Sequence, residues 1–471
     1  MEALDPRDQL VAEQRALIAE LRAALEAAHK RIAELEARLN QNSTNSSKPP
    51  STDPPGMPGK RKGGSGRKPG GQPGHKRNLR ELLPTEQVDH LNIMRPESCA
   101  HCDEPLQGSD SAPLRHQVTE IPVVKPTVTE WQLQQLKCHQ CGKKTRAQLP
   151  DGVPNEAFGP VLSSVVALCT VRFRQSKRLV QELLSTMLNV ELSLGAVCKI
   201  EQKMSQALAT PVQEAGLYVQ QQARANADET GWYEGKADGK KQLAWLWTVT
   251  TSLVTVFRIA KSRGADVAKE MLGKGFAGIL GSDRWSAYNF VDSCRRQLCW
   301  SHLIRDIQGF VDRGGEGAKI GLQLQQQVTL MFGYWHRVRD GTLQRTTLQR
   351  RMIPVQRKIL RLLRSARAEA EPKTRGMAKA MLKFQAALFT FVHMPDVEPT
   401  NNVSERQVRQ AVIMRKLSCG TESANGSRFV ERMLTVTATL RQQQRNVLDY
   451  LIAAHHARIA GDTAPSLLPL S

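Results

Sequence analysis

Long apolar runs are missing from this sequence. Its 471 residues contain no run of about 18 or more apolar residues, the length that a membrane-spanning helix needs. The first thirty residues carry many charges of both signs, which excludes a secretory signal peptide. We therefore expect a cytoplasmic protein without a membrane partner.

Acidic residues are also scarce. Asp and Glu total 45 against 66 Lys and Arg, giving a net charge of +21 and a pI near 9.8. Such a surplus favours a polyanionic partner, because neutralising phosphates releases bound counterions. Hydrophobic residues make up 40% of the chain, which has room for roughly two to four domains.

Cysteines are few and odd in number, which argues against a disulfide framework. Four of the nine form two Cys-x-x-Cys pairs, Cys99 with Cys102 and Cys138 with Cys141. Two such pairs can supply the four thiolates of a tetrahedral zinc site, although a redox dithiol is the alternative. We predict a zinc-ribbon-like domain over residues 81–150, with strands at 117–124 and 127–136. His101 and His139 lie inside the pairs and could replace a thiolate.

The N-terminal forty residues follow a heptad pattern. Apolar residues recur every seven positions, and no Pro or Gly interrupts residues 7–39; the recurring residues are Leu4, Val11, Ile18, Leu25, Ile32 and Leu39. This predicts a coiled coil over residues 1–40 that forms a homodimer or a higher oligomer, although a single amphipathic helix docked on its own domain would show a similar pattern.

Residues 41–80 have few apolar side chains and cannot fold alone. We expect a disordered basic linker there. It is either merely solvated or also binds DNA phosphates, through Lys60, Arg61, Lys62, Arg67 and Lys68. Residues 151–215 are expected to form helices at 158–174, 176–188 and 193–208. The last two resemble a helix-turn-helix DNA-binding segment, although ordinary helical packing is the more common reason for such a pair.

An α/β core is expected downstream. Strands are predicted at 242–250, 253–259, 277–280 and 296–300, with a helix at 265–272 and a turn at 235–239. Three isolated acids, Asp228, Asp283 and Glu405, are candidates for one metal site, because hard divalent cations prefer carboxylate ligands from separate elements. Spacing alone leaves ordinary roles open: acids after strands often belong to turns, and residues 402–405 match a helix capping box.

Six motifs together resemble the bacterial DDE transposases of insertion sequence family sixty-six. They are Asn-Ser-Ser-Lys-Pro-Pro-Ser at 45–51, Ala-Asp-Glu-Thr-Gly-Trp at 227–232, Gly-Ser-Asp-Arg-Trp-Ser-Ala-Tyr at 281–288, Gln-Leu-Cys-Trp-Ser-His-Leu-Ile-Arg-Asp at 297–306, Glu-Pro-Thr-Asn-Asn-Val-Ser-Glu-Arg at 398–406 and Gly-Ser-Arg-Phe-Val-Glu-Arg at 426–432. The resemblance implies an RNase H-like catalytic domain over residues 216–446. It also implies that Asp228, Asp283 and Glu405 form an acidic triad that binds Mg²⁺ or Mn²⁺.

The resemblance also implies a role: a nucleoid-associated enzyme that binds element ends, cleaves DNA and transfers strands to target DNA, with accessory proteins of the same element as possible partners. A catalytically inactive zinc and coiled-coil regulator, or a metal-dependent nuclease that never joins, are the alternatives. A helical insertion is expected at about 315–395, and residues 447–471 are expected to form a helix followed by a disordered tail.

Several other residues are candidates for roles around the predicted site. Twelve basic residues against three acidic ones in 337–375 favour a DNA-contacting face over a merely solvated one. Arg406 and Arg409 are candidates for phosphate binding. Cys299 and His302 supply only two ligands for a metal, and Glu229 is excluded from the triad because neighbouring residues of a strand point to opposite faces.

Overall fold

The structure is a computed structural model that describes residues 6–42, 45–48, 53, 74, 80–369 and 371–469. The chain divides into two units, residues 1–57 together with 128–471, and residues 58–127. Each unit is described by itself. The phosphate-binding candidates Lys60, Arg61, Lys62, Arg67 and Lys68, and nearly all of the predicted linker, lie outside the described residues.

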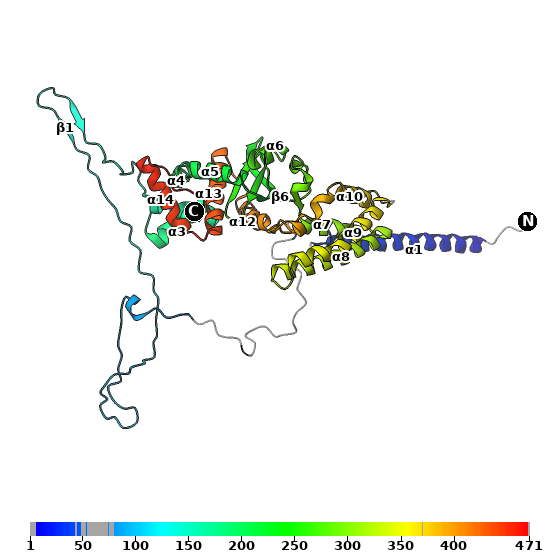
Figure 1. Cartoon of the computed structure of the whole chain (residues 1–471), viewed down its shortest axis with the longest axis horizontal. Coiled ribbons are helices and arrows are strands. Elements are labelled where there is room, and N and C mark those ends of the chain that lie inside the picture. The colour runs from blue at the N-terminus through cyan, green and yellow to red at the C-terminus, as the bar shows by residue number, and fades with distance from the viewer. Residues whose placement is uncertain are drawn as a thin grey trace, which may run out of the picture. The chain divides into compact units, whose positions relative to one another are not determined.

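The larger unit is built on a five-stranded mixed sheet (Figure 1). Its strands are β3 (Arg224–Ala237), β4 (Lys240–Thr250), β5 (Thr255–Ala260), β6 (Ile279–Ser282) and β7 (Arg296–Leu298), and the spatial order is β5-β4-β3-β6-β7. The first three strands are antiparallel, whereas β6 runs parallel to β3 and β7 parallel to β6. The α/β character expected of this region is therefore confirmed.

The hairpin between β3 and β4 closes at Asp238 and Gly239. Both residues have positive φ, 50° and 73°, as a two-residue turn matched to the twist of the strands requires. The turn therefore falls inside the predicted range 235–239. The strand itself continues further than expected, to Ala237, because an irregularity between Tyr233 and Lys236 lets the pairing resume beyond it.

Helices cover the sheet and build a common core with it. Four of them contribute buried apolar side chains to this core, α5 (Ala209–Gln220), α6 (Ala265–Leu272), α13 (Ala424–Gln442) and α14 (Val447–Ala460). α6 has the predicted bounds. α13 ends and α14 begins beside the Gln-rich run at 442–444, so this polar run separates the two helices.

The helices before the sheet also follow the sequence closely. They are α2 (Pro160–Ala167), a π-helical segment (Leu168–Arg172), α3 (Lys177–Leu188) and α4 (Leu194–Ala207). Ser176 and Ser193 are the N-caps of α3 and α4, and each hydroxyl accepts a backbone N–H three residues on. Val180, Leu184, Val197 and Ile200 give the pair a small core of its own. DNA binding by this pair of helices stays a prediction.

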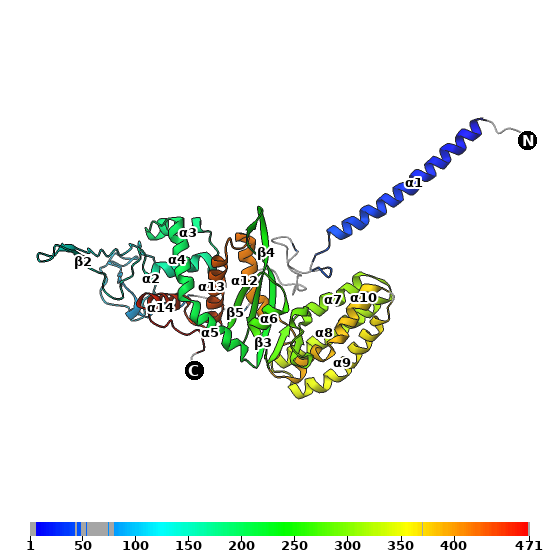
Figure 2. The same cartoon turned by 90° about the horizontal axis from the view of Figure 1, so that it is seen from above.

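A second group of helices follows β7 in the sequence and precedes the motif at 398–406. It consists of α7 (Trp300–Asp312), α8 (Gly315–Arg339), α9 (Arg345–Arg367), α10 (Pro372–Lys383) and the short α11 (Thr390–His393). Figure 2 shows α7, α8, α9 and α10 packed together. They share a second hydrophobic core, which Leu298 at the edge of the sheet joins to β7.

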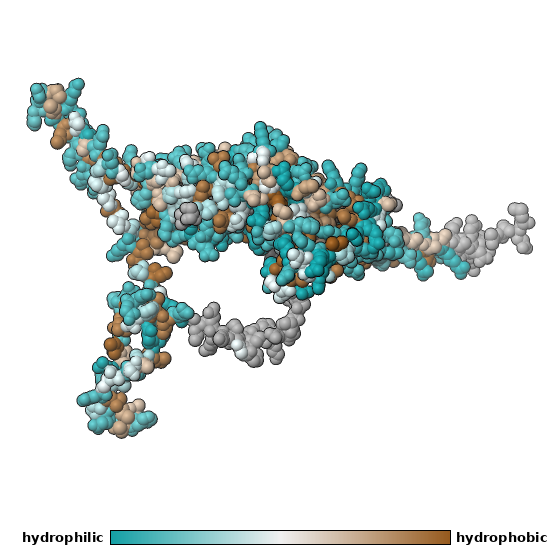
Figure 3. Space-filling view, in the orientation of Figure 1, coloured by the Kyte–Doolittle hydropathy of each residue, from teal (hydrophilic) through white to brown (hydrophobic). Residues whose placement is uncertain are grey.

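The strand predicted at 117–124 is wrong, and the one predicted at 127–136 is observed only at its end, where a short strand begins at Gln135. Only β1 (Gln135–Lys137) and β2 (Lys144–Arg146) form a ladder in residues 81–150, and a single short helical turn, Thr85–Gln87, precedes them. The alternating residues Val118, Ile121 and Val123 are 79–80% exposed, and Figure 3 shows brown apolar residues scattered along this extended part of the chain. Alternation produces a strand only where a neighbouring strand and a packing face exist.

The expectation of a disordered C-terminal tail is also wrong. Leu467 is fully buried in the core of the sheet, and the Tyr450 hydroxyl donates to the Pro465 carbonyl at 2.6 Å. Arg445 and Gln443 donate to further tail carbonyls. The tail is ordered because it fills an apolar gap, which its composition does not reveal.

The N-terminal helix α1 (Pro6–Leu39) is continuous, as its heptads predict. Among its described side chains, Ile18, Leu21, Leu25 and Ile32 are at least half exposed. Self-association through this stripe stays a prediction. No described helix of the protein is both long and apolar enough to cross a membrane.

Candidate active site and cysteine turns

Asp228 lies in the central strand of the sheet. β3 pairs with β6 in parallel at Ala225 with Leu280 and Asn226 with Gly281, and extending this register by two residues places Asp228 beside Asp283. Residues that pair across a sheet project from the same face. The two carboxylates, which are 55 residues apart in sequence, are therefore neighbours at the end of β6.

Asp283 is held by a tight loop after β6. Its Oδ1 accepts the Trp285 backbone N–H at 2.8 Å. The buried guanidinium of Arg296 donates to the Asp283 carbonyl at 2.9 Å and to the Ser282 hydroxyl at 3.0 Å. Burial lowers the pKa of Arg296 to about 10, so it stays protonated at neutral pH and keeps these bonds to the loop.

Glu405 comes from the first turn of α12 (Asn402–Ser418). The Asn401 side-chain amide donates to the Ala227 carbonyl at 2.8 Å, and the Ser404 hydroxyl donates to the Asn226 carbonyl at 3.0 Å. These bonds clamp the helix start to the strand segment that carries Asp228. The capping-box alternative is not observed, because Asn401 is the N-cap and makes no side-chain capping bond.

The pKa of Asp228 is affected by both of the other predicted acids. Burial, and then the charges of Glu229, Asp283 and Glu405, raise the pKa of Asp228 well above its ordinary value. The single hydrogen bond recorded for its carboxylate comes from the Glu229 backbone N–H at 3.0 Å. A bound cation would relieve this repulsion, and three carboxylates suit a hard divalent ion. The chemistry of the three acids therefore suits the predicted metal, whereas the group of three donor atoms that lie within 4.8 Å of one another among the described residues is Cys299, His302 and Glu405.

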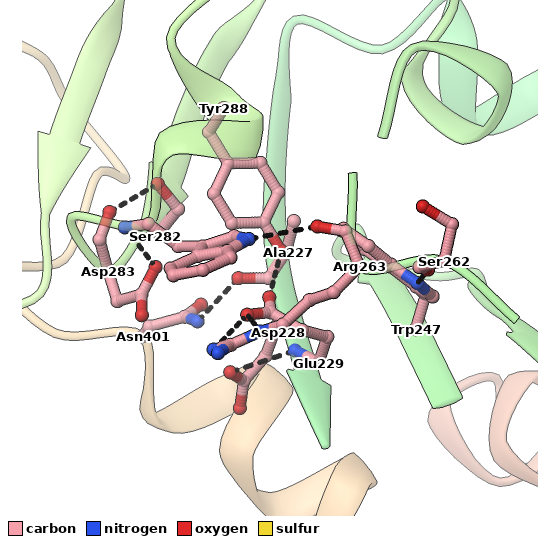
Figure 4. A network of polar contacts seen from close by, with 11 residues as sticks. Ala227, Asp228, Glu229, Trp247, Ser262, Arg263, Ser282, Asp283, Tyr288 and Asn401 are labelled. Atoms are coloured by element: carbon pink, nitrogen blue, oxygen red, sulfur yellow. Dashed lines mark hydrogen bonds and ion pairs between the residues drawn. The ribbon is translucent and has the colours of Figure 1, made fainter. Parts of the chain in front are cut away.

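Glu229 takes no part in this cluster of oxygens and forms a buried network instead (Figure 4). Its side chain is 1% exposed, and its Oε1 accepts two N–H groups of Arg263 at 3.0 and 2.7 Å. Its Oε2 accepts the Tyr288 hydroxyl at 2.5 Å. Burial nevertheless raises the pKa of Glu229, with a further contribution from Asp283. This position agrees with the exclusion of Glu229 from the triad.

Arg263 joins this network to the loop of Asp283. Its guanidinium stacks on the rings of Trp285 and Trp245, at 3.8 and 4.5 Å from their centroids, and its carbonyl accepts the Trp285 indole N–H at 3.0 Å. Trp285 in turn donates its backbone N–H to Asp283. Arg263 lies in none of the six motifs, so no sequence signal singles it out, whereas Tyr288 and Trp285 fall in the motif at 281–288 and could have been selected there.

Glu405 also faces the first turn of α7 and the residue that caps it. The Cys299 Sγ lies 3.7 Å and the His302 Nδ1 3.5 Å from Glu405 Oε1, and the three donor atoms lie within 4.8 Å of one another. The sequence offers only Cys299 and His302 as potential metal ligands at this position. The structure places Glu405 beside them as a third potential ligand. Burial raises the pKa of Cys299 to about 11, so the thiol is protonated at neutral pH.

The two Cys-x-x-Cys pairs form turns of the same kind. In each, the first cysteine N–H donates to the carbonyl five residues on, and its carbonyl accepts the N–H four residues on, at 2.8–3.0 Å. The residue at that fourth position has positive φ in both, Asp103 at 58° and Gly142 at 71°. Backbone N–H groups inside the turns lower the pKa of Cys99 and of Cys138, which favours thiolates. Cys99 and Cys102 belong to the smaller unit, and Cys138 and Cys141 to the larger one.

The basic candidates are placed on solvated surfaces. Arg406 and Arg409 are exposed on α12, and Arg409 lies one turn beyond Glu405 on the same face. α9 carries eight basic residues and no acidic one. Four of its exposed arginines recur at helical spacing on one side, Arg350, Arg357, Arg361 and Arg364.

Comparisons with known proteins identify family models that match this chain. A sequence model described as "Transposase IS66 family" matches residues 158–428, more than half of the chain, and a "Family of unknown function (DUF6444)" matches residues 3–81. The chain is 25% identical over 260 residues to "Uncharacterized protein y4qI" of Sinorhizobium fredii (strain NBRC 101917 / NGR234). That match covers 50% of this chain and 47% of the relative, so the chain spans about half the length of the curated relative it matches.

Proposed function

Because the chain belongs to the IS66 transposase family, we propose that it binds the ends of a bacterial insertion sequence, cleaves DNA there and joins the released 3′-hydroxyl to target DNA. Both reactions are phosphodiester transfers by direct attack at phosphorus, without a covalent link between protein and DNA. The observation that supports the proposal is that Asp228 lies near enough to Asp283 and Glu405, which come from two other elements, for their charges to raise its pKa.

The strand order supports an RNase H-like catalytic domain. Numbered along the chain, the strands lie in the order 3-2-1-4-5, with the first three antiparallel and the last two parallel to the first. Asp228 lies on the first strand and Asp283 directly after the fourth. Acids at these positions project from the same end of a rigid sheet, where a nucleic-acid backbone can approach them.

The three carboxylates would hold the divalent metal, Mg²⁺ or Mn²⁺. Such ions, when bound, activate the attacking oxygen and stabilise the leaving oxygen of a phosphodiester. The chain's own contribution is positioning. Asn401 and Ser404 fix Glu405 against β3, Arg296 fixes the backbone of Asp283, and the Glu229–Arg263–Tyr288 network holds the strand and the loop together.

Two basic surfaces would bring DNA to this position. Arg409, on the same face of α12 as Glu405, and the neighbouring Arg406 would hold phosphates next to the cleaved bond. The arginine stripe from Arg350 to Arg364 spans about 21 Å of α9, a length of several nucleotides. No ion pair neutralises these four arginines among the described residues, so their charge is available to a polyanion.

Zinc and self-association complete the proposal. Each of the turns at Cys99–Cys102 and Cys138–Cys141 would supply one thiolate pair to the structural Zn²⁺ that the sequence predicts, and the two turns have the same backbone geometry. The uncovered apolar stripe of α1 supports a coiled-coil homodimer or higher oligomer, which would let one complex hold two DNA ends.

The test is a strand-transfer assay with donor ends, Mg²⁺ and a target plasmid. Asp228→Asn removes a charged ligand at nearly constant volume, and we expect cleavage and joining to fall by about 100-fold or more while DNA binding persists. Asp238→Asn, in the exposed β3–β4 turn, is the matched control and should leave both steps unchanged. Undiminished joining by the Asp228→Asn protein would contradict the assignment.

The same assay separates the other two candidates. Wild-type protein that cuts the donor but yields no joined product would be a nuclease. Protein that binds DNA and neither cuts nor joins it with Mg²⁺ or Mn²⁺ present would be a regulator.

A further inference from the structure

A small recess lies where the π-helical segment, α12 and α13 meet. Three arginines line it, Arg172 at the end of the π-helical segment, Arg174 two residues later and Arg441 near the end of α13. Gln410 of α12 lies among them. Its Oε1 accepts from Arg174 Nη1 at 2.9 Å and from Arg172 Nη1 at 3.5 Å. One neutral oxygen thus serves two guanidinium groups.

The positive charge of this recess is not neutralised. Among the residues that the structure describes, no carboxylate forms an ion pair with Arg172, Arg174 or Arg441. Burial, and then the charges of Arg441 and Arg174, lower the pKa of Arg172, and no acid offsets them. Three neighbouring cations without an anion repel one another in the free protein, and the repulsion is strongest at the partly buried Arg172.

The backbone around the first two arginines is unusual as well. Leu168–Arg172 is π-helical, and Arg174 has a φ of 58°, in the left-handed region that a residue with a side chain rarely adopts. From this segment the side chains of Arg172 and Arg174 both reach Gln410. A strained conformation persists only where the surrounding structure enforces it, and such strain is concentrated at binding sites.

The size of the recess limits what it can accept. Its enclosed part is about 20 Å³, enough for roughly one water-sized group and far too small for a base or a sugar. A phosphodiester can place one non-bridging oxygen there while the rest of the nucleotide stays outside. Arg441, which is exposed, can close over the second oxygen.

The recess is also distinct from the carboxylate site. Gln407 and Gln410 follow Glu405 by two and five residues, which places them about 200° and 140° around the helix from it. The recess therefore opens on the opposite side of α12, about one helix diameter away from the acids. A phosphate bound there cannot be the one that is cleaved.

From this geometry we propose that Arg172, Arg174 and Arg441, with Gln410, bind a backbone phosphate of DNA at a position remote from the cleaved bond. The proposal rests on the proposed function only in taking DNA as the substrate. The subsite would fix the path of the strand past α12 and would be indifferent to base sequence, because only phosphate oxygens fit.

Gln410→Glu is the most direct test, because the variant side chain has the same shape and places a carboxylate where we expect the phosphate of DNA to bind. The new carboxylate should pair with Arg172 and Arg174, so the melting temperature should rise while the affinity for DNA falls. Binding of a labelled duplex of arbitrary sequence is measured by fluorescence anisotropy against salt concentration. The slope of log K against log salt should shrink by about 0.9 for each phosphate that the variant protein no longer binds. Gln242→Glu, an exposed site on β4, is the control for net charge.

Two further arms separate the possible outcomes. Arg441→Gln should make the dependence of log K on log salt shallower, and Arg441→Lys should largely restore the wild-type dependence. Inorganic phosphate should compete poorly with the duplex, because a single phosphate lacks the contacts that neighbouring nucleotides make. Efficient competition would mean that the ligand of the recess is a free anion and not DNA, which would overturn the proposal. A Gln410→Glu protein that is more stable than the wild type yet keeps the full slope would overturn the subsite alone. A wild-type protein that binds no duplex at all would overturn the proposed function with it.

Discussion

The buried pair Glu229–Arg263 offers a quantitative test of how the site is held. Arg263→Met keeps an apolar side chain between Trp245 and Trp285 but removes both N–H bonds to Glu229. The Glu229 side chain is 1% exposed and would become an almost unpaired buried charge. Breaking a buried pair from one side in this way costs about 3–5 kcal/mol.

A double-mutant cycle isolates the interaction from the loss of packing. Glu229→Gln removes the charge and leaves a group of the same shape, so the double variant Glu229→Gln/Arg263→Met no longer buries an unpaired ion. We expect the double variant to be more stable than Arg263→Met alone, with a coupling energy of about 2 kcal/mol or more. Urea unfolding followed by tryptophan fluorescence measures it, since Trp245 and Trp285 flank the pair.

An exposed pair provides the control for this cycle. Lys319 and Glu316 form an ion pair with side chains 71% and 67% exposed, so Lys319→Met should leave the unfolding midpoint unchanged. A coupling between Glu229 and Arg263 below about 0.5 kcal/mol would refute the reasoning. The pair would then be incidental to the stability of the site.

Three other features of the structure each make a single prediction. Burial raises the pKa of Glu431 from 4.5 to about 7. Because the folded state binds the carboxyl proton more tightly than the unfolded state, the wild type should lose up to about 3 kcal/mol of stability between pH 4.5 and pH 7. Glu431→Gln should flatten the dependence of the free energy of unfolding on pH in this range. Asn401→Ala would strip the Ala227 carbonyl of its donor, costing about 1–3 kcal/mol, and should slow strand transfer, whereas Asn402→Ala, at an exposed position, should do neither. Purified protein should contain about one zinc ion per chain, and Cys138→Ser should reduce it; metal-free wild-type protein would refute the zinc site.

Local signals in the sequence are enough for much of the fold. Ser193 can be identified as the start of a helix because a hydroxyl that caps a helix acts within three residues of its own position. The bounds of α6 and the position of the β3–β4 turn are equally local. The failures occur where partners are distant: residues 117–124 alternate like a strand but have no neighbouring strand in the structure, and Leu467 belongs to a segment with the composition of a loose tail, although the core of the sheet buries it.

In the candidate site, too, local signals can be identified from the sequence and contacts between distant residues cannot. Asp228, Asp283 and Glu405 can be chosen from motifs, yet nothing in the sequence links Asn401 to the Ala227 carbonyl 174 residues away, or Arg263 to Glu229 across two strands. Those contacts give each carboxylate its own surroundings. Adjacent residues of one strand, Asp228 and Glu229, differ because Arg263 and Tyr288 neutralise the second and leave the first facing two other acids. A site built this way needs its charge imbalance: if Arg263 also reached Asp228, the carboxylates would have little reason to bind a cation.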